Sequence, residues 1–194
     1  MKKLLKLGLL SVALASSVIA NASNKVKVEV LASNELSITM SEVVEGEVLS
    51  ITNKKGKLVF SEILSATSSY TKTLDFSKLT QGVYYVKAET ESAVKVTPFI
   101  IVPDQVKIIK GATKTYNAPV FKVENGIAEV SIDNKDLHDV SITVYAKNSS
   151  IPLEEVRLNT PKITKTYNFE SLPVSEYKIV IYQGDYSYVK TVKR

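Results

Sequence analysis

The sequence predicts an all-β protein in which a short leader is followed by two tandem antiparallel β-sandwich domains. Three observations predict this fold class. Apolar and polar residues alternate with a period of two over many short segments, turn-forming residues separate these segments, and one stretch recurs later in the chain. No segment after the leader keeps an apolar period of 3.6 residues, so we expect very little helix.

The first 22 residues have the three parts of a secretory signal peptide. Three lysines lie in the first six residues, an apolar stretch covers residues 7–20, and an Ala-Asn-Ala triplet precedes Ser23. The apolar stretch is shorter than the roughly 20 residues that cross a bilayer. We therefore expect cleavage between Ala22 and Ser23 rather than a retained anchor, and export to the periplasm, the outer surface or the medium without a transmembrane span.

Composition removes several classes of function. The chain has no cysteine, which excludes disulfides, thiolate metal sites, cysteine nucleophiles and a lipoprotein acceptor. The net charge of the whole chain is +5, but without the leader 22 basic residues face 20 acidic ones. Because the basic residues alternate with Glu, Ser and Thr instead of gathering in a patch, we expect no nucleic-acid binding.

Period-two alternation locates the strands. Val26, Val28 and Val30 alternate with charged residues, as in a strand buried on one face. The Asn125-Gly126 pair predicts a type I′ hairpin, because both residues tolerate a positive φ. Many short strands at this spacing predict immunoglobulin-like sandwiches. The expected strands after the first are 36–40, 48–52, 58–60, 83–88, 94–102, 106–109, 121–124, 127–132, 140–144, 176–182 and 188–192.

An internal repeat divides the chain. Residues 71–79 (TKTLDFSKL) match residues 164–172 (TKTYNFESL) at an offset of 93. Upstream, residues 49–52 match residues 140–143 at an offset of 91, which implies two extra residues in the loop of the second copy. The triplet Pro103-Asp104-Gln105 is turn-forming and contains no apolar side chain other than proline. The predicted parts are a signal peptide over 1–22 and domains over 23–104 and 105–194.

The repeat also predicts the packing. Residues on one face of each matched strand are expected in the core, and a phenylalanine and a leucine are expected to close one end of each sandwich. The strand 94–102 is long and apolar, so it either packs against the second domain or serves as a docking edge. The expected core residues are Tyr84, Val86, Ala88, Phe76 and Leu79, with their counterparts Tyr177, Ile179, Ile181, Phe169 and Leu172.

Two stretches of the first copy carry a family resemblance. Residues 51–59 read ITNKKGKLV, and residues 74–87 read LDFSKLTQGVYYVK. This pattern resembles the C-terminal sorting domain of cargo proteins of the type IX secretion system, the Por secretion tail family. Its members are small β-sandwiches with a strand–glycine turn–strand unit and a leucine followed by a Gly-Val-Tyr strand. The resemblance covers about residues 36–101 and 127–194.

The second copy departs from the family pattern. Ser175 stands where the first copy has Gly82, and residues 147–150 (KNSS) replace the turn at Gly56. We therefore interpret the chain as two tandem copies, of which the second is degenerate. The resemblance implies delivery to the cell envelope or surface, with secretion machinery or another envelope protein as partner.

The residues that could carry chemistry are few. The single histidine, His138, lies in the acidic loop 133–139 (DNKDLHD), where we expect a solvated side chain. The three carboxylates and the amide of this loop could hold calcium, but the spacing does not fit an EF-hand and the loop has no glycine. We expect no enzyme, with no catalytic residue, no cofactor and no metal site.

Three tyrosines give a candidate binding surface. Tyr182, Tyr186 and Tyr188 flank the turn at residues 183–185 and could form a platform for sugar rings or a partner protein. Tyrosine is also an ordinary strand former, so packing is the competing interpretation. The leading functional hypothesis is an exported structural or secretion-associated protein. The alternative is a periplasmic or extracellular binding module for peptide, protein or glycan.

Overall fold

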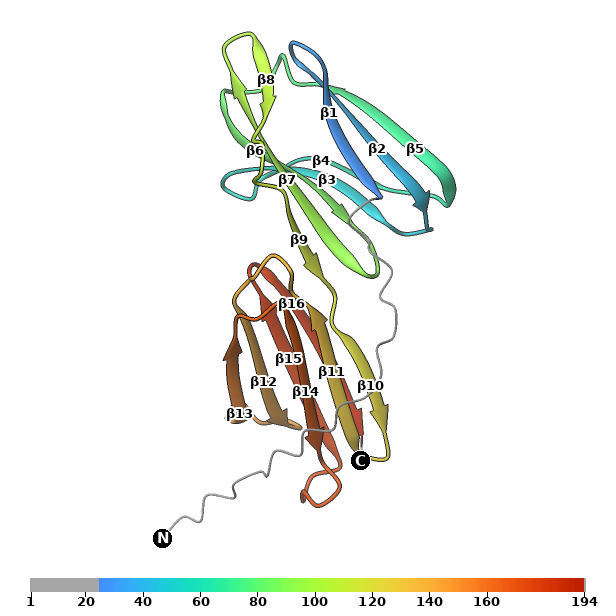
Figure 1. The fold of residues 1–194 in the computed structure, drawn as a ribbon, viewed down its shortest axis with the longest axis vertical. Coiled ribbons are helices and arrows are strands. Elements are labelled where there is room, and N and C mark those ends of the chain that lie inside the picture. The colour runs from blue at the N-terminus through green and yellow to red at the C-terminus, as the bar shows by residue number, and fades with distance from the viewer. Residues whose placement is uncertain (1–24, 194) are drawn as a thin grey trace. The chain divides into compact units, whose positions relative to one another are not determined.

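The computed structural model describes residues 25–193, and within them every regular element is a β-strand (Figure 1). All strand pairs are antiparallel. The predicted cleavage position, Ala22 and Ser23, lies outside the described residues. In the described range, no helix of a length and apolarity suited to crossing a membrane is present. The chain forms two compact units, which divide after Ala118.

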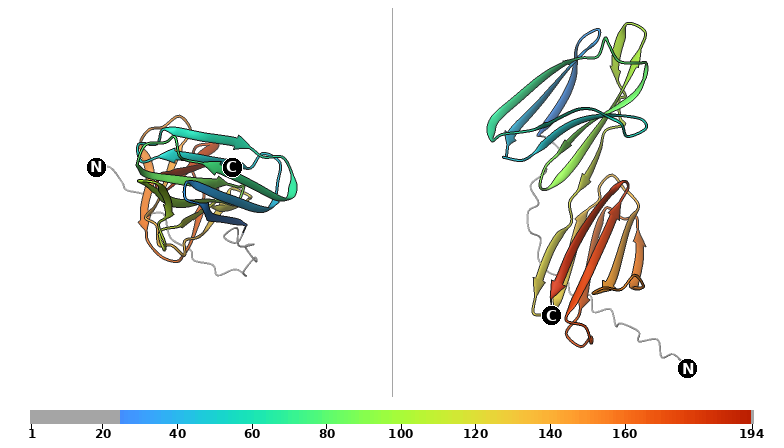
Figure 2. Two further views of the ribbon diagram at one scale, coloured as in Figure 1. Left: turned by 90° about the horizontal axis from the view of Figure 1, so that it is seen from above. Right: turned by 180° about the vertical axis from the view of Figure 1, so that it is seen from behind.

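The N-terminal domain consists of two facing sheets (Figures 1 and 2). One sheet has the order β1-β2-β5. The other has the order β4-β3-β6-β7-β8, and β9 also pairs with β7. The strands are β1 (Val26–Ala32), β2 (Glu35–Val43), β3 (Val48–Asn53), β4 (Leu58–Ile63), β5 (Thr67–Asp75), β6 (Gly82–Glu89), β7 (Ala93–Val102), β8 (Gln105–Ile108) and β9 (Lys114–Asn117).

The C-terminal domain repeats this arrangement with fewer strands. Its sheets have the orders β10-β11-β14 and β13-β12-β15-β16. Strand for strand, these orders correspond to β1-β2-β5 and β4-β3-β6-β7, so both domains are immunoglobulin-like sandwiches. The strands are β10 (Val120–Glu124), β11 (Ile127–Asp133), β12 (Val140–Ala146), β13 (Pro152–Leu158), β14 (Lys162–Asn168), β15 (Glu176–Gln183) and β16 (Tyr186–Lys193).

The strand register corrects the upstream alignment of the two copies. Ile51 pairs with Val86, and Val144 pairs with Ile179. Since Val86 and Ile179 are 93 residues apart, Ile51 corresponds to Val144, and the offset of 93 continues through β3 and β12. The expected offset of 91 is wrong by two residues. A shift of two keeps every side chain on the same face of the strand, so the apolar pattern could not exclude it.

The turn at Pro103-Asp104-Gln105 lies inside the first domain. Asp104 has a φ of 60°, and Val102 pairs with Gln105, so the triplet closes the hairpin between β7 and β8. The division of the chain therefore falls after Ala118 and not after Asp104. The triplet does form a turn, but a hairpin turn and a domain linker have the same residue preferences.

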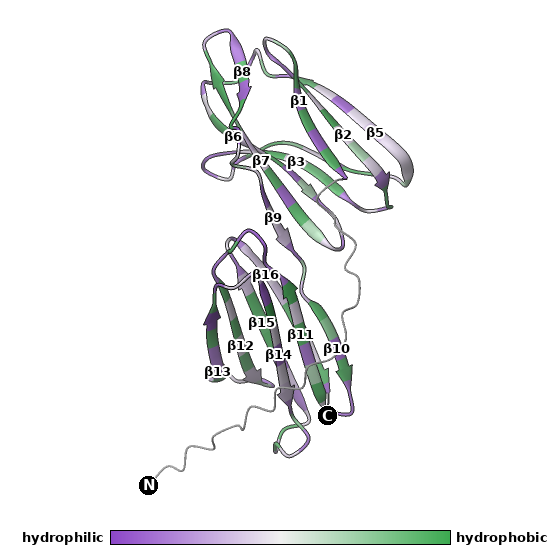
Figure 3. Ribbon diagram, viewed as in Figure 1, coloured by the Kyte–Doolittle hydropathy of each residue, from purple (hydrophilic) through white to green (hydrophobic). Residues whose placement is uncertain are grey.

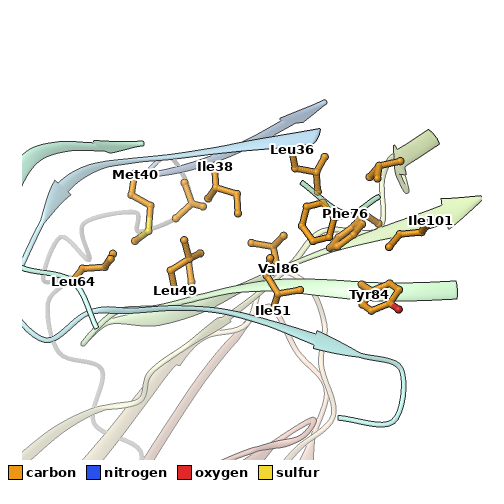
Figure 4. Close-up of a cluster of buried hydrophobic side chains, with 14 of the residues drawn as sticks. Leu36, Ile38, Met40, Leu49, Ile51, Leu64, Phe76, Tyr84, Val86 and Ile101 are labelled. Atoms are coloured by element: carbon orange, nitrogen blue, oxygen red, sulfur yellow. The ribbon is translucent and has the colours of Figure 1, made fainter. Parts of the chain in front are cut away.

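Aromatic rings close one end of each core. In the N-terminal domain, Phe99 meets Phe76 edge to face at 5.0 Å and stacks on Tyr84 at 5.6 Å between ring centroids. Figure 4 shows Phe76 and Tyr84 at this end, with Leu36, Ile38 and Met40 of β2 extending the cluster. In the C-terminal domain, Phe169 stacks on Tyr177 at 4.5 Å.

The packing expected from the repeat is confirmed. The six expected strand residues of β6 and β15 are buried, as are both phenylalanines, while Leu79 and Leu172 are partly buried against the two cores. Hydropathy alternates along the strands (Figure 3), and β2 gives the clearest case, because Leu36, Ile38 and Met40 are fully buried between exposed or half-buried residues.

Truncating Phe99 should destabilise the protein strongly. Phe99→Ala removes a fully buried ring with two aromatic neighbours, so we expect a loss of about 3–5 kcal/mol in the free energy of unfolding. Denaturant titration measures this loss. Val30→Ala, at an exposed position of β1, is the control and should change stability by no more than about 0.5 kcal/mol. A similar loss in both variants would contradict the assignment of Phe99 to the core.

Candidate functional site

The acidic loop 133–139 is organised around the buried amide of Asn134. Its Oδ1 accepts from the backbone N–H of His138 at 3.0 Å and from Nε2 of Gln183 at 3.3 Å. Its Nδ2 donates to the carbonyl oxygens of His138 at 2.9 Å and Thr160 at 3.1 Å. Both oxygen lone pairs and both amide protons are thus used, so Asn134 fixes the loop against the loop between β13 and β14 and against the end of β15.

His138 is buried, not solvated as expected. Its exposed fraction is 7 %, because the bonds of Asn134 hold its backbone inside the loop. The carboxylates around it have structural partners: Asp133 forms an ion pair with Lys135 at 3.0 Å, and Asp139 accepts from Nδ2 of Asn159 at 2.9 Å. Between residues 25 and 193, no three His, Asp or Glu side chains converge in a way that could hold a metal ion.

The three candidate tyrosines do not form one surface. Tyr182 pairs with Ser187 and is 51 % exposed on the outer face of its sheet. Tyr186 pairs with Gln183 and Tyr188 with Ile181, so both have the inward register of β15, and Tyr188 packs against the core. The expected tyrosine platform is therefore divided between the two faces of the sheet.

Strand β7, expected as a docking edge or domain contact, has strands on both sides. β6 pairs along its whole length on one side. On the other side, β8 pairs with Phe99–Val102 and β9 pairs with Ala93–Val96. The two short strands follow β7 directly in the chain, and their pairing satisfies backbone groups that an edge would leave open.

Strand β4, in contrast, is an edge strand with exposed apolar side chains. In the described part of the chain its only strand partner is β3. Leu58, Val59 and Ile63 are 57 %, 37 % and 73 % exposed. Ser61 and Ile63 pair with Ser50 and Val48, so they lie on the outer face, opposite to the core residues Leu49 and Ile51. The outer face of β4 therefore carries no charge.

The inner side of β4 is closed by a polar cluster with β5. Nζ of Lys72 lies 2.9 Å from Oε2 of Glu62 and 5.4 Å from the centre of the Phe60 ring. Burial, together with the neighbouring Glu62 carboxylate, raises the pKa of Tyr70 to about 12. The hydrogen bond from Lys72 lowers the pKa of Glu62. This side of the sandwich is held together by charge and aromatic contact as well as by apolar packing.

Comparison with known proteins gives one family match. Residues 32–102 match the family described as "Secretion system C-terminal sorting domain", and this segment contains β2 to β7 in full. The match supports the resemblance of the first copy to that family. No curated protein matches the chain.

Two solved structures are similar over most of the chain. One is "Biofilm associated protein - BSP domain", at 12 % identity and a TM-score of 0.28, covering 87 % of this chain and 29 % of that one. The other is "Human OSCAR ligand-binding domain", at 10 % identity and a TM-score of 0.26, covering 87 % of this chain and 96 % of that one. The chain thus spans less than a third of the first structure. At these TM-scores neither likeness carries an argument about function.

Removing the Asn134 amide should destabilise the C-terminal domain. Asn134→Ala leaves buried backbone groups of His138 and Thr160 without a partner, so we expect a loss of at least about 2 kcal/mol in unfolding free energy. Denaturant titration measures it. Asn159→Ala removes an exposed hydrogen bond and should cost less than about 1 kcal/mol. Equal costs would show that Asn134 is not the organising residue.

The raised pKa of Tyr70 predicts a stability loss at high pH. The unfolded chain loses this proton near pH 10, whereas the folded chain keeps it to about pH 12. Because the unfolded state then binds fewer protons, the free energy of unfolding falls as pH rises from about 10 to about 12. Tyr70→Phe should make this fall shallower in urea titrations at successive pH values. An unchanged slope would exclude the contribution of Tyr70.

Proposed function

We propose that the protein is an exported, non-catalytic β-sandwich protein, delivered to the cell envelope or surface by the type IX secretion system. The match of residues 32–102 to the sorting-domain family carries this proposal. The leader of residues 1–22 supports its first step, export across the inner membrane. The partners under this proposal are the secretion machinery and other envelope proteins.

The two domains have different roles under this proposal. Both share one strand order, which supports descent from one sorting-type sandwich. The family is defined by a C-terminal position, and the matched copy is followed by a second sandwich. Because the second sandwich has the strand order of the matched copy, our proposal gives sorting to residues 119–194 and the role of folded passenger to residues 25–118.

The structural use of the polar side chains supports a non-catalytic role. An enzyme needs a base or nucleophile that is free to reach a substrate. In the acidic loop, all four hydrogen bonds of the Asn134 amide are made to other groups of the protein, and Asp133 forms an ion pair with Lys135. Binding or scaffolding by strand surfaces needs no such groups.

Intact-mass spectrometry of the native protein from periplasm, medium and outer surface tests the proposal. We expect a surface or medium species that lacks the C-terminal domain or carries a C-terminal modification, because sorting signals are processed on arrival. A full-length chain beginning at Ser23 and confined to the periplasm would contradict sorting. That outcome would favour the alternative function, a binding module for peptide, protein or glycan.

Reporter fusions separate the roles of the domains. A fluorescent reporter with its own signal peptide is fused upstream of residues 119–194 or of residues 25–118, in a host that has type IX secretion. We expect surface delivery only with residues 119–194, measured by protease accessibility on intact cells. Delivery by residues 25–118 alone would assign sorting to the other domain, and delivery by neither would contradict sorting.

A further inference from the structure

The same edge position is protected in one domain and unprotected in the other. In the C-terminal domain, β13 occupies the place of β4 and begins with Pro152, and its outer face carries an ion pair between Arg157 and Glu155 at 3.2 Å. Proline and charge are the usual means by which edge strands avoid pairing with another chain. β4 has neither on its outer face, where Ser61, Ile63 and Leu58 lie, paired with Ser50, Val48 and Thr52 of β3.

The two ends of β4 carry opposite charge. Before it, the turn of residues 54–57 (KKGK) places three exposed lysines. After it, the chain is hydrogen-bonded to the acidic loop between β2 and β3: the N–H of Leu64 donates to the carbonyl of Glu47 at 2.8 Å, and that of Ala66 to Oε2 of Glu45 at 3.1 Å. A basic end and an acidic end therefore flank the apolar edge.

We propose that β4 pairs with β4 of a second copy of this chain, antiparallel and about a two-fold axis at Ser61. Antiparallel pairing brings the lysine turn of each copy to the loop between β2 and β3 of the other copy. Two oppositely charged contacts therefore form, one at each end of the paired strands. The exposed acidic residues there are Glu45 in the loop itself and Glu42 just before it, near the end of β2.

The register follows from the alternation of faces. Opposite residues in an antiparallel pair share a face of the sheet. Since both strands are β4, two opposite residues must both have odd numbers or both have even numbers. With Ser61 opposite Ser61, Ile63 of each copy meets the bulged start of the other β4, where Leu58 and Val59 are exposed, so the pairing covers apolar side chains at both ends. On the inner side Phe60 faces Glu62, and each Glu62 stays beside the Lys72 of its own copy.

A second copy fits this edge better than an unrelated peptide. An unrelated peptide would need apolar residues opposite β4, an acidic residue opposite the lysine turn and a basic residue opposite the loop between β2 and β3. The β4 segment with its flanking loops contains all three features in the order that its own antiparallel image requires. The dimer joins two sheets through one pair of strands and so removes both open edges.

Cysteine cross-linking tests the axis directly, since the chain contains no cysteine. Opposite Cα atoms in an antiparallel pair lie about 4.5–5.5 Å apart, which is within the range that a disulfide spans. We expect full-length Ser61→Cys to form a disulfide-linked dimer under mild oxidation at least about tenfold faster than Glu155→Cys, the matched position on β13. Equal rates in the two variants would overturn the proposal.

Charge exchange tests the ends of the strand without using cysteine. Sedimentation velocity of the chain from Ser23 onward should show a monomer–dimer equilibrium. The double variant Lys55→Glu with Lys57→Glu should raise the Kd of the dimer about tenfold or more. Each altered turn is then negatively charged and meets the negatively charged loop between β2 and β3 of the other copy.

Adding Glu42→Lys and Glu45→Lys to the same chain should restore dimerisation. A chain that stays monomeric at all accessible concentrations would overturn the proposal, even if β4 then proved to bind another protein. Failure of restoration would overturn the antiparallel register.

Discussion

Each domain depends on one tyrosine, placed near the start of the strand that lies at the centre of the larger sheet. The hydroxyl of Tyr84 donates to the carbonyl of Thr80 at 2.8 Å, while its ring stacks on Phe99. The hydroxyl of Tyr177 accepts from the N–H of Val174 at 3.0 Å, while its ring stacks on Phe169. One side chain thus fixes the incoming loop and closes the core, as the tyrosine corner of immunoglobulin-like folds does. The direction of the bond differs between the two domains, and Pro173 occupies the place of Thr80.

The sequence predicted the strands that alternate clearly and missed those that do not. β5 has only Tyr70 and Leu74 as large apolar residues among serines, threonines and charges, and β13 begins with proline and carries three charged residues. β5, β13 and β14 are all edge strands of their sheets, so much of their surface stays polar. β9 is four residues long and exists because the β7 edge is available. Such strands are set by tertiary pairing, which a local pattern cannot supply.

The candidate site divides in the same way. The separation of the tyrosines is predictable from the hairpin itself. A two-residue turn at Gly184-Asp185 pairs residue 183 with residue 186, so Tyr186 and Tyr188 share one face of the sheet and Tyr182 lies on the other. The burial of His138 did not follow from any local signal. Asn134, which holds the backbone of His138, is itself bonded to Gln183, 49 residues further along the chain. Contacts of that range become visible only once the sheets are assembled.

The two domains keep their cores alike and differ at their edges. Substitutions inside the core are limited by close packing, so Tyr84, Val86 and Phe76 have close counterparts 93 residues later. Edge strands have no such limit, because one side of each faces solvent. There the N-terminal domain covers β7 with β8 and β9 and leaves β4 apolar, whereas the C-terminal domain protects the position of β4 with proline and charge. An exposed apolar edge strand lowers solubility, and the proline and charges of β13 avoid this in the C-terminal domain. The N-terminal domain can keep an apolar β4 if this edge is covered by a second copy in the dimer.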